Sequence, residues 1–176
     1  FFPAVEKGIA ESVKKGPLAA YPVTGIKAVL YDGSYHPVDS SEMAFKVATQ
    51  QAFKKGIMEA KPVLLEPIAT LKVVVPEGYT GDVMGELNKI GRASCRGELN
   101  KRRARVMGMN PTDNGYQEIV ADIPYLELYG YNATLRSMTS GSGTFSYEFA
   151  RYEQAPDDVA AKQIEERASK LVEVEE

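Results

Sequence analysis

The chain has 176 residues, of which 44% are hydrophobic and 26% are charged, and its formal net charge is -3. This length suits one or two compact domains, and the apolar fraction is ample for a buried core. The single Cys excludes a fold held together by internal disulfides and favours a reducing cytoplasm. No apolar run reaches the roughly 18–20 residues of a membrane span, so we expect no membrane partner.

Residues 4–15 predict an amphipathic helix. Apolar side chains recur there every four positions, which places them on one helical face, at Val5, Ile9 and Val13. Residues 21–35 are rich in β-branched and aromatic side chains and predict a strand. We expect this strand to end in a turn at Asp32-Gly33-Ser34, because Asp, Gly and Ser favour turns.

A second helix is predicted to start near Asp39. Asp39 and Glu42 have the spacing of a capping box, which is better explained as helix capping than as a catalytic carboxylate pair. The helix is expected to reach about residue 60, where Lys61-Pro62 ends it. An apolar connector between two prolines then suggests a domain boundary. We therefore divide the chain into residues 1–66, 67–154 and 155–176.

The second half of the chain alternates between predicted strands and helices. The strands are expected at residues 71–75, 105–109, 118–123 and 144–152. The helices are expected at residues 79–103 and 125–138, and after Pro156 at residues 157–174. Turn-forming residues from Pro111 to Gly115 separate the two middle strands. The order β-α-β-β-α-β is the ferredoxin-like arrangement, so we predict an α+β fold.

One passage interrupts the first helix of this second half. The residues Gly85-Glu86-Leu87-Asn88-Lys89 recur as Gly97-Glu98-Leu99-Asn100-Lys101. Glycines inside a helix each cost about 1 kcal/mol relative to Ala. The intervening Ile90-Gly91-Arg92-Ala93-Ser94-Cys95-Arg96 reads like a translated sequencing adapter. We interpret residues 90–101 as an artefactual insertion, with a genuine insertion as the alternative.

Charge is unevenly distributed along the chain. One stretch is strongly basic and contains Lys89, Arg92, Arg96, Lys101, Arg102, Arg103 and Arg105. The segment from Glu153 onward is mainly acidic. A local positive field suits RNA phosphates, although a solvated helix end explains the same pattern. The chain has one His and one Cys, and its sequence shows no nucleophile–base pair. We therefore expect neither general acid–base catalysis nor zinc chemistry.

Several motifs resemble bacterial elongation factor G. Three of them resemble the distal part of its domain IV and lie at residues 16–23, 30–46 and 62–68, the middle one containing Tyr31-Asp32-Gly33-Ser34-Tyr35-His36. Three more resemble its domain V and are Gly81-Asp82-Val83-Met84-Gly85-Glu86-Leu87-Asn88, Tyr129-Gly130-Tyr131 and Leu135-Arg136-Ser137. The resemblance covers nearly the whole chain apart from residues 90–101 and the acidic tail.

The resemblance implies an organisation for the chain. Residues 1–66 would be a partial, ribosomal-protein-like βαβ domain IV whose N-terminal strands are missing, and residues 67–154 a ferredoxin-like domain V. Residues 155–176 would be an acidic C-terminal helix. No Gly-x-x-x-x-Gly-Lys-Ser/Thr phosphate loop occurs in the chain. We therefore expect no enzyme activity in this fragment, and we expect GTP and Mg²⁺ to bind in the missing G domain of a GTPase parent.

The resemblance also implies functional residues. The loop that would meet the codon–anticodon duplex at the decoding centre comprises Asp32, Gly33, Ser34, Tyr35 and His36. For His36, the alternative is an ordinary surface turn. The candidates for contact with ribosomal RNA, near the sarcin–ricin loop and the stalk base, are Arg102, Arg103, Arg105, Gly130, Arg136 and Gly141. For Gly141, the alternative is a plain helix-to-strand turn.

The implied function is ribosome binding in support of GTP-dependent translocation of tRNA and mRNA, by a cytoplasmic monomer. Pro37 stands where the housekeeping factors usually carry an acidic residue, and Ser142 where they often carry a basic one. These departures favour a second possibility, a divergent elongation factor G-like paralogue without full translocase activity. The sequence leaves both possibilities open.

Overall fold

The computed structural model describes the backbone of residues 1–88 and 103–172. The chain forms two compact units, one made of Phe1–Leu64 together with the segment from Ala155 onward, and the other of Leu65–Gln154. The predicted domain limits at residues 66 and 154 stay predictions. The proposed insertion at residues 90–101 lies outside the described residues.

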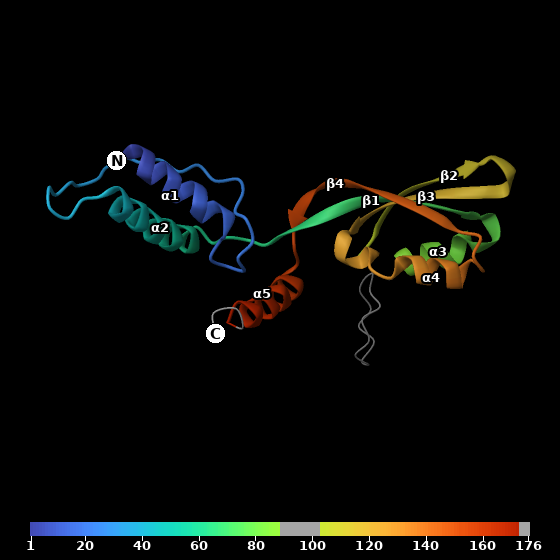
Figure 1. Cartoon of the computed structure of the whole chain (residues 1–176). Coiled ribbons are helices and arrows are strands. Elements are labelled where there is room, and N and C mark those ends of the chain that lie inside the picture. Colours follow the sequence, from blue (N-terminus) through green and yellow to red (C-terminus); the bar gives the residue numbers. More distant parts are fainter. Residues whose placement is uncertain (89–102, 173–176) are drawn as a thin grey trace. The chain divides into compact units, whose positions relative to one another are not determined.

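Two helices dominate the first unit. Helix α1 spans Phe2–Lys14 and helix α2 spans Glu42–Glu59, so both predicted helices are present. The two run side by side (Figure 1). Gly8 permits their close approach, because a Cβ atom there would lie 3.1 Å from both the Lys46 carbonyl oxygen and the Thr49 Cβ. A salt bridge of 2.7 Å between Glu11 and Lys46 crosses the same contact. Helix α5, Asp157–Val172, follows after the second unit, as expected.

Two predictions for the first unit are wrong. Residues 21–35 form no strand, because a strand requires a neighbour to share its hydrogen bonds and the described part of this unit offers none. The N-cap of α2 is Ser41, whose side chain accepts a hydrogen bond from the Ala44 amide at 3.1 Å. Asp39 therefore does not cap the helix, and its carboxylate lies beside His36 instead.

The second unit contains a four-stranded antiparallel sheet with strand order β2-β3-β1-β4. The strands are β1 Leu65–Pro76, β2 Arg105–Thr112, β3 Tyr116–Pro124 and β4 Thr144–Gln154. Helices α3, Thr80–Leu87, and α4, Tyr131–Met138, lie on one face (Figure 1). Short 3₁₀ turns η1, Glu77–Tyr79, η2, Asp113–Gly115, and η3, Tyr125–Leu128, join these elements. The predicted ferredoxin-like α+β fold is confirmed.

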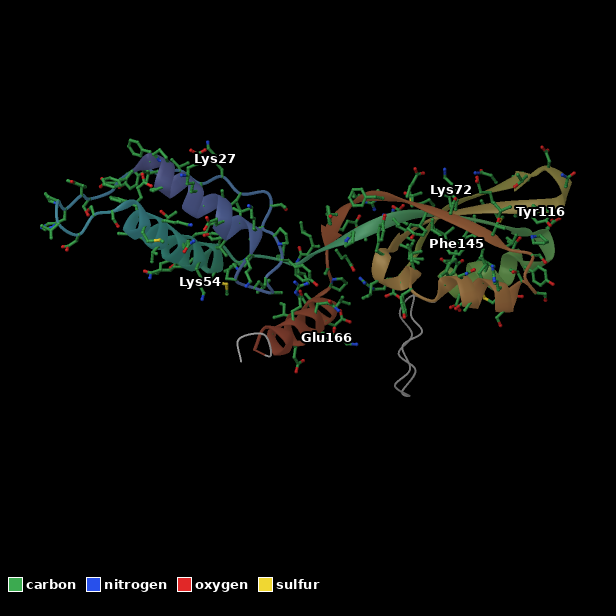
Figure 2. The ribbon with its side chains drawn as sticks, viewed as in Figure 1. Lys27, Lys54, Lys72, Tyr116, Phe145 and Glu166 are labelled. Carbon is green, nitrogen blue, oxygen red and sulfur yellow. The ribbon has the colours of Figure 1, made fainter. Side chains whose placement is uncertain are left out.

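The core of this unit lies between the sheet and the two helices. Alternate residues of β1 point to the helices and are fully buried, as the period of a strand requires, at Ala69, Leu71, Val73 and Val75. Val83 and Leu87 from α3 and Tyr131 and Leu135 from α4 complete the other side. Lys72 lies on the face away from the helices and Phe145 on the face toward them (Figure 2). The sheet therefore has one buried and one open face.

Of the two helices predicted at residues 79–103 and 125–138, the second is divided in the structure and the first can be compared only over its described residues. The helix expected at residues 125–138 is divided into η3 and α4 by Gly130, which adopts φ +72° and so interrupts the helical hydrogen bonds. Helix α3 ends at Leu87, and most of the remainder of the helix expected up to residue 103 falls outside the described residues. All four predicted strands are present and extend beyond their predicted C-terminal ends, while β1 and β3 also start earlier.

Candidate functional site

The loop before α2 is organised around His36. The Ser40 amide donates a hydrogen bond to the His36 carbonyl at 3.0 Å, and the His36 amide donates one to the Ser40 Oγ at 2.9 Å. The His36 Nδ1 lies 3.3 Å from an oxygen of Asp39, with the two side chains 67% and 81% exposed. These contacts fix a turn over residues 37–39 and present the imidazole to solvent.

The other predicted loop residues lie in the same exposed segment. The Gly33 amide donates a hydrogen bond of 2.7 Å to the Asp32 carboxylate. The turn of this loop lies at residues 37–39 and not at the predicted Asp32-Gly33-Ser34. The Tyr35 ring stacks on Phe1 at 5.6 Å between centroids, and Phe1 stacks in turn on Phe45 of α2 at 4.5 Å. Ser34 is exposed. The structure thus brings Asp32 to His36 together in one solvent-facing loop anchored to α2 through aromatic rings.

The Arg103 side chain is paired with two carboxylates of the protein. Its Nη1 and Nη2 donate to both oxygens of Glu66, at 2.6 and 2.7 Å, and its Nε lies 3.5 Å from Glu127. The hydrogen bonds with Glu66 raise the pKa of Arg103, against a lowering by burial, and the charges of both carboxylates add to the rise. The guanidinium is thereby engaged within the protein. Arg102 lies outside the described residues.

Arg105 and Arg136 are exposed on separate elements. Arg105 begins β2 and lies opposite Asp122 of β3. Arg136 lies in the last turn of α4, and its side chain makes no hydrogen bond or ion pair with the described residues. The Gly141 amide donates to the Arg136 carbonyl at 2.9 Å, and Gly141 adopts φ +84°, so it closes the helix in the left-handed conformation that favours glycine. Gly130 stands at the opposite end of α4.

Arg151 of β4 is a charged residue that the sequence did not single out. Its Nη1 donates to Asp122 at 2.8 Å and its Nε donates to Glu153 at 2.6 Å. The hydrogen bond with Asp122, followed by that with Glu153, raises the pKa of Arg151. This exposed group is therefore part of an ion-pair network on the protein surface.

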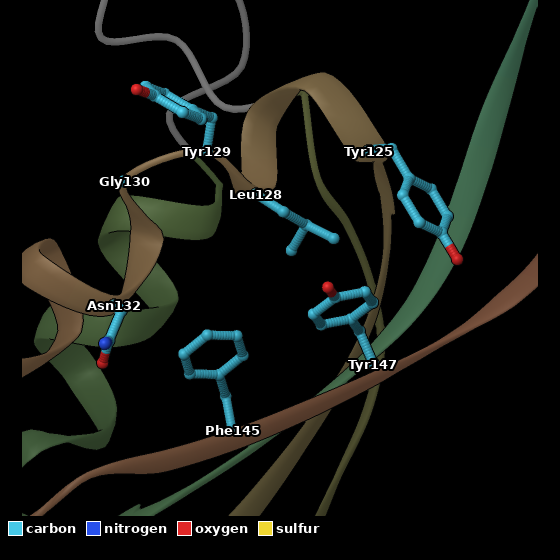
Figure 3. Close-up of a pocket in the computed structure, with 7 residues that line it drawn as sticks. All are labelled: Tyr125, Leu128, Tyr129, Gly130, Asn132, Phe145 and Tyr147. Carbon is cyan, nitrogen blue, oxygen red and sulfur yellow. The ribbon is translucent and has the colours of Figure 1, made fainter.

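The sequence analysis also missed a pocket of about 370 Å³ in the second unit. It opens between η3, the start of α4 and β4 (Figure 3), and it is lined by Tyr125, Leu128, Tyr129, Gly130, Asn132, Phe145 and Tyr147. Phe145 and Tyr147 are two positions apart on β4 and therefore share a face of the sheet. The four aromatic residues of the lining come from two segments, with Tyr125 and Tyr129 in one and Phe145 and Tyr147 in the other. The sequence shows these aromatic residues but not that they converge on one pocket.

The described residues include no group of three or more His, Cys, Asp or Glu side chains that could hold a metal ion. Among the helices that the structure describes, none is long and apolar enough to cross a membrane. What the described surfaces offer is hydrogen bonding, aromatic stacking and positive charge. These are the means by which proteins recognise large polar partners.

The fold and these surfaces define an α+β protein of two units, one with an exposed histidine loop and one ferredoxin-like. Comparison with known families agrees: the family "Elongation factor G, domain IV" matches residues 1–61, and "Elongation factor G C-terminus" matches residues 63–163. The chain belongs to the elongation factor G family and corresponds to a region of a translation elongation factor.

Individual relatives support this assignment. The chain is 46% identical over 175 residues to the elongation factor G-like protein of Thermotoga maritima, a match that covers 99% of this chain and 24% of the relative. A crystal structure of a Thermus thermophilus protein matches 96% of this chain and 24% of its own, with 41% identity and a TM-score of 0.77. The chain thus spans about a quarter of the length of these relatives.

Proposed function

We propose that this chain is the ribosome-binding C-terminal region of a translational GTPase that promotes translocation of tRNA and mRNA. The main support is the two family matches, which follow in the order domain IV at residues 1–61 and C-terminus at residues 63–163. Neither matched domain is a G domain. GTP and Mg²⁺ would bind elsewhere in the longer protein, and energy would come from there. We place the protein in the cytoplasm, acting as a monomer.

The histidine loop is proposed to enter the decoding centre and contact the tRNA–mRNA duplex. Its exposed imidazole has Nδ1 directed at Asp39, 3.3 Å away. With Nδ1 carrying the proton toward that carboxylate, Nε2 is left to accept a hydrogen bond from an RNA 2′-hydroxyl. Asp32, Gly33 and the ring of Tyr35 lie in the same loop. Contacts of this kind depend on shape and position rather than on chemical catalysis.

The ferredoxin-like unit is proposed to bind ribosomal RNA of the large subunit, at the sarcin–ricin loop and the stalk base. Arg136 supports this proposal because it is exposed and has no described partner for its guanidinium. An Arg fork matches the geometry of phosphate oxygens. Arg105 is exposed as well, whereas Arg103 would contribute by holding the fold through Glu66.

A second function class is a ribosome-associated elongation factor G-like GTPase without full translocase activity. The name of the Thermotoga maritima relative, elongation factor G-like protein, favours it. Pro37 and Ser142 are the residues of this chain that depart from the pattern of the housekeeping factors. Both candidates share ribosome binding, and they differ in whether the longer protein drives tRNA movement.

The test is competition on the ribosome. The chain is added to a reconstituted system in which elongation factor G drives a single round of translocation. If the chain occupies the factor's site, translocation slows as its concentration rises, and excess factor restores the rate. A variant that combines Gly33→Val, His36→Ala and Arg136→Ala serves as the control and should inhibit less. An unchanged rate at saturating chain concentration would contradict the proposal.

A further inference from the structure

The aromatic pocket of the ferredoxin-like unit has a rigid back and an exposed rim. Tyr125, Leu128 and Phe145 are partly buried and pack on the core, so they are held in place. At the rim, Tyr129 is 92% exposed and Tyr147 is 51% exposed. Gly130 lacks a side chain and leaves the entrance between η3 and α4 clear (Figure 3). Large exposed rings beside a preformed hollow indicate a binding surface.

The rings are arranged to present flat faces. The planes of Phe145 and Tyr147 lie within 16° of parallel, with centroids 6.4 Å apart. Tyr125 packs edge-on against Tyr147 at 5.7 Å, and Tyr131 packs edge-on against Phe145 at 5.2 Å. The two edge contacts restrain the two near-parallel rings. The result is a platform to which a planar ring can be added by stacking.

Polar groups follow along one side of α4. Asn132 lines the pocket, and its amide carries both donors and an acceptor. Arg136 is four residues further on, so it lies on the same face of the helix, one turn away. Arg136 is exposed and has no side-chain partner among the described residues. A stacking platform, an amide and a cation one turn apart together match a base and its neighbouring phosphate.

We propose that this pocket binds one unstacked base of single-stranded RNA, with the Asn132 amide on the base edge and Arg136 on an adjacent phosphate. The inference rests on the proposed function and names the RNA feature that the ferredoxin-like unit recognises. A base splayed from a loop stacks readily on aromatic side chains, whereas a base inside a duplex does not expose its face. An apolar peptide side chain would leave the amide and the cation unused.

The proposal is tested with the full 176-residue chain. The probe is a fluorescent, unstructured RNA of about eight nucleotides, within the site sizes of single-strand binders. Competitors are the same RNA annealed to its complement, an abasic strand of equal length, and free nucleoside monophosphates. The variants are Tyr129→Ala, Tyr147→Ala and Arg136→Ala. Tyr152→Ala is the matched control, because Tyr152 is 63% exposed on the same strand but lies outside the pocket.

The expected result is that Tyr129→Ala and Tyr147→Ala each weaken binding on the order of 10-fold, as loss of one stacked base implies. Arg136→Ala should flatten the slope of log affinity against log salt by about 0.7. The duplex and the abasic strand should compete poorly, and monophosphates weakly. Equal binding by Tyr129→Ala and Tyr152→Ala, or competition by the abasic strand as strong as by the intact RNA, would overturn the proposal.

These outcomes are separate from the test of the proposed function. If the chain competes on the ribosome while the Tyr129→Ala and Tyr147→Ala variants bind the probe unchanged, the pocket assignment fails alone. If those variants lose probe binding but the chain does not compete on the ribosome, the ribosomal role fails and the RNA site remains. No probe binding by the unmodified chain also overturns the pocket assignment.

Discussion

Arg103 holds Glu66 through a two-pronged ion pair, with 2.6 Å between Nη1 and Oε1 and 2.7 Å between Nη2 and Oε2. The contact joins a residue two positions ahead of β2 to the second residue of β1. Both side chains are mostly shielded from solvent, at 26% and 14% exposure. A residue predicted to meet RNA therefore stabilises the ferredoxin-like unit on which the other RNA candidates lie.

Replacing Arg103 is expected to destabilise the protein. Arg103→Ala leaves the shielded Glu66 carboxylate without its two hydrogen bonds, which costs about 2 kcal/mol in the free energy of unfolding. Arg103→Lys should recover only part of this, because an ammonium cannot make the bidentate contact. Urea unfolding followed by circular dichroism measures both. Equal stability of the Arg103→Lys variant and the unmodified chain would contradict the stabilising role of the bidentate contact.

The same pair predicts how this contribution varies with pH. Hydrogen bonding to Glu66 raises the pKa of Arg103, so the cation is more stable in the folded state. Its stabilisation is fully present below the ordinary guanidinium pKa and is lost only as pH rises through the raised value. The difference between the unmodified chain and Arg103→Ala should therefore stay constant from neutral pH to about pH 10. A difference that shrinks within this range would argue against the pairing.

The two glycines of the helix pair should respond in opposite ways. Gly8→Leu places a side chain where even a Cβ atom lies 3.1 Å from the Lys46 carbonyl, and overpacking of this kind costs about 2 kcal/mol. A Cβ atom added at Gly56 would meet no atom within 4 Å, so Gly56→Ala should gain up to about 1 kcal/mol from helix propensity. Thermal unfolding compares the two, and a tolerated Gly8→Leu would contradict the close contact.

Thr139 is expected to stabilise the end of α4 through its hydroxyl group. It is fully buried, its hydroxyl donates to the Leu135 carbonyl at 2.7 Å, and it accepts from the Gly143 amide at 2.9 Å. Thr139→Val keeps the shape but leaves that amide unpaired, at a cost of about 1–3 kcal/mol. Hydrogen exchange should accelerate at Gly143 in this variant. Ser142→Ala, one residue away, is the control and should leave the exchange at Gly143 unaltered.

The histidine loop can be tested in a chimera in which this chain replaces the matching C-terminal region of the elongation factor G that drives the translocation assay. His36→Ala removes a hydrogen bond to RNA worth about 1.5 kcal/mol, so single-round translocation should slow on the order of 10-fold. GTP hydrolysis should be unaffected. Lys54→Ala, an exposed change on α2, is the control. A His36→Ala chimera with the unmodified translocation rate would exclude the loop from the mechanism.

The sequence predicted most of the second unit because each of its strands carries its own signal. β1 alternates between buried and half-buried residues from Ala69 to Pro76, and Gly115 marks the turn before β3. The division at Gly130 was missed because a single glycine is tolerated within a helical pattern. The pocket was missed because its residues come from η3, α4 and β4, which only the packed sheet brings together.

The first unit shows where local patterns are insufficient. Residues 21–35 have the composition of a strand, yet composition does not supply the neighbour that a strand needs. Asp39 and Ser41 both suit an N-cap, and the choice of Ser41 frees Asp39 for His36. The sequence also shows where the arginines are but not which of them have partners. Only the structure distinguishes Arg103, which is paired with Glu66, from Arg136.

The central claim is that the histidine loop lies at the decoding centre of the small subunit, whereas the ferredoxin-like unit binds ribosomal RNA of the large subunit. The most direct measurement is photocrosslinking of the chain to ribosomes from single probes placed at Tyr35, Ser137 and Lys54, followed by mapping of the crosslinked nucleotides. We predict small-subunit decoding-centre RNA from Tyr35, large-subunit RNA from Ser137, and little from Lys54. Crosslinks from Tyr35 and Ser137 no stronger than those from Lys54 would contradict the claim.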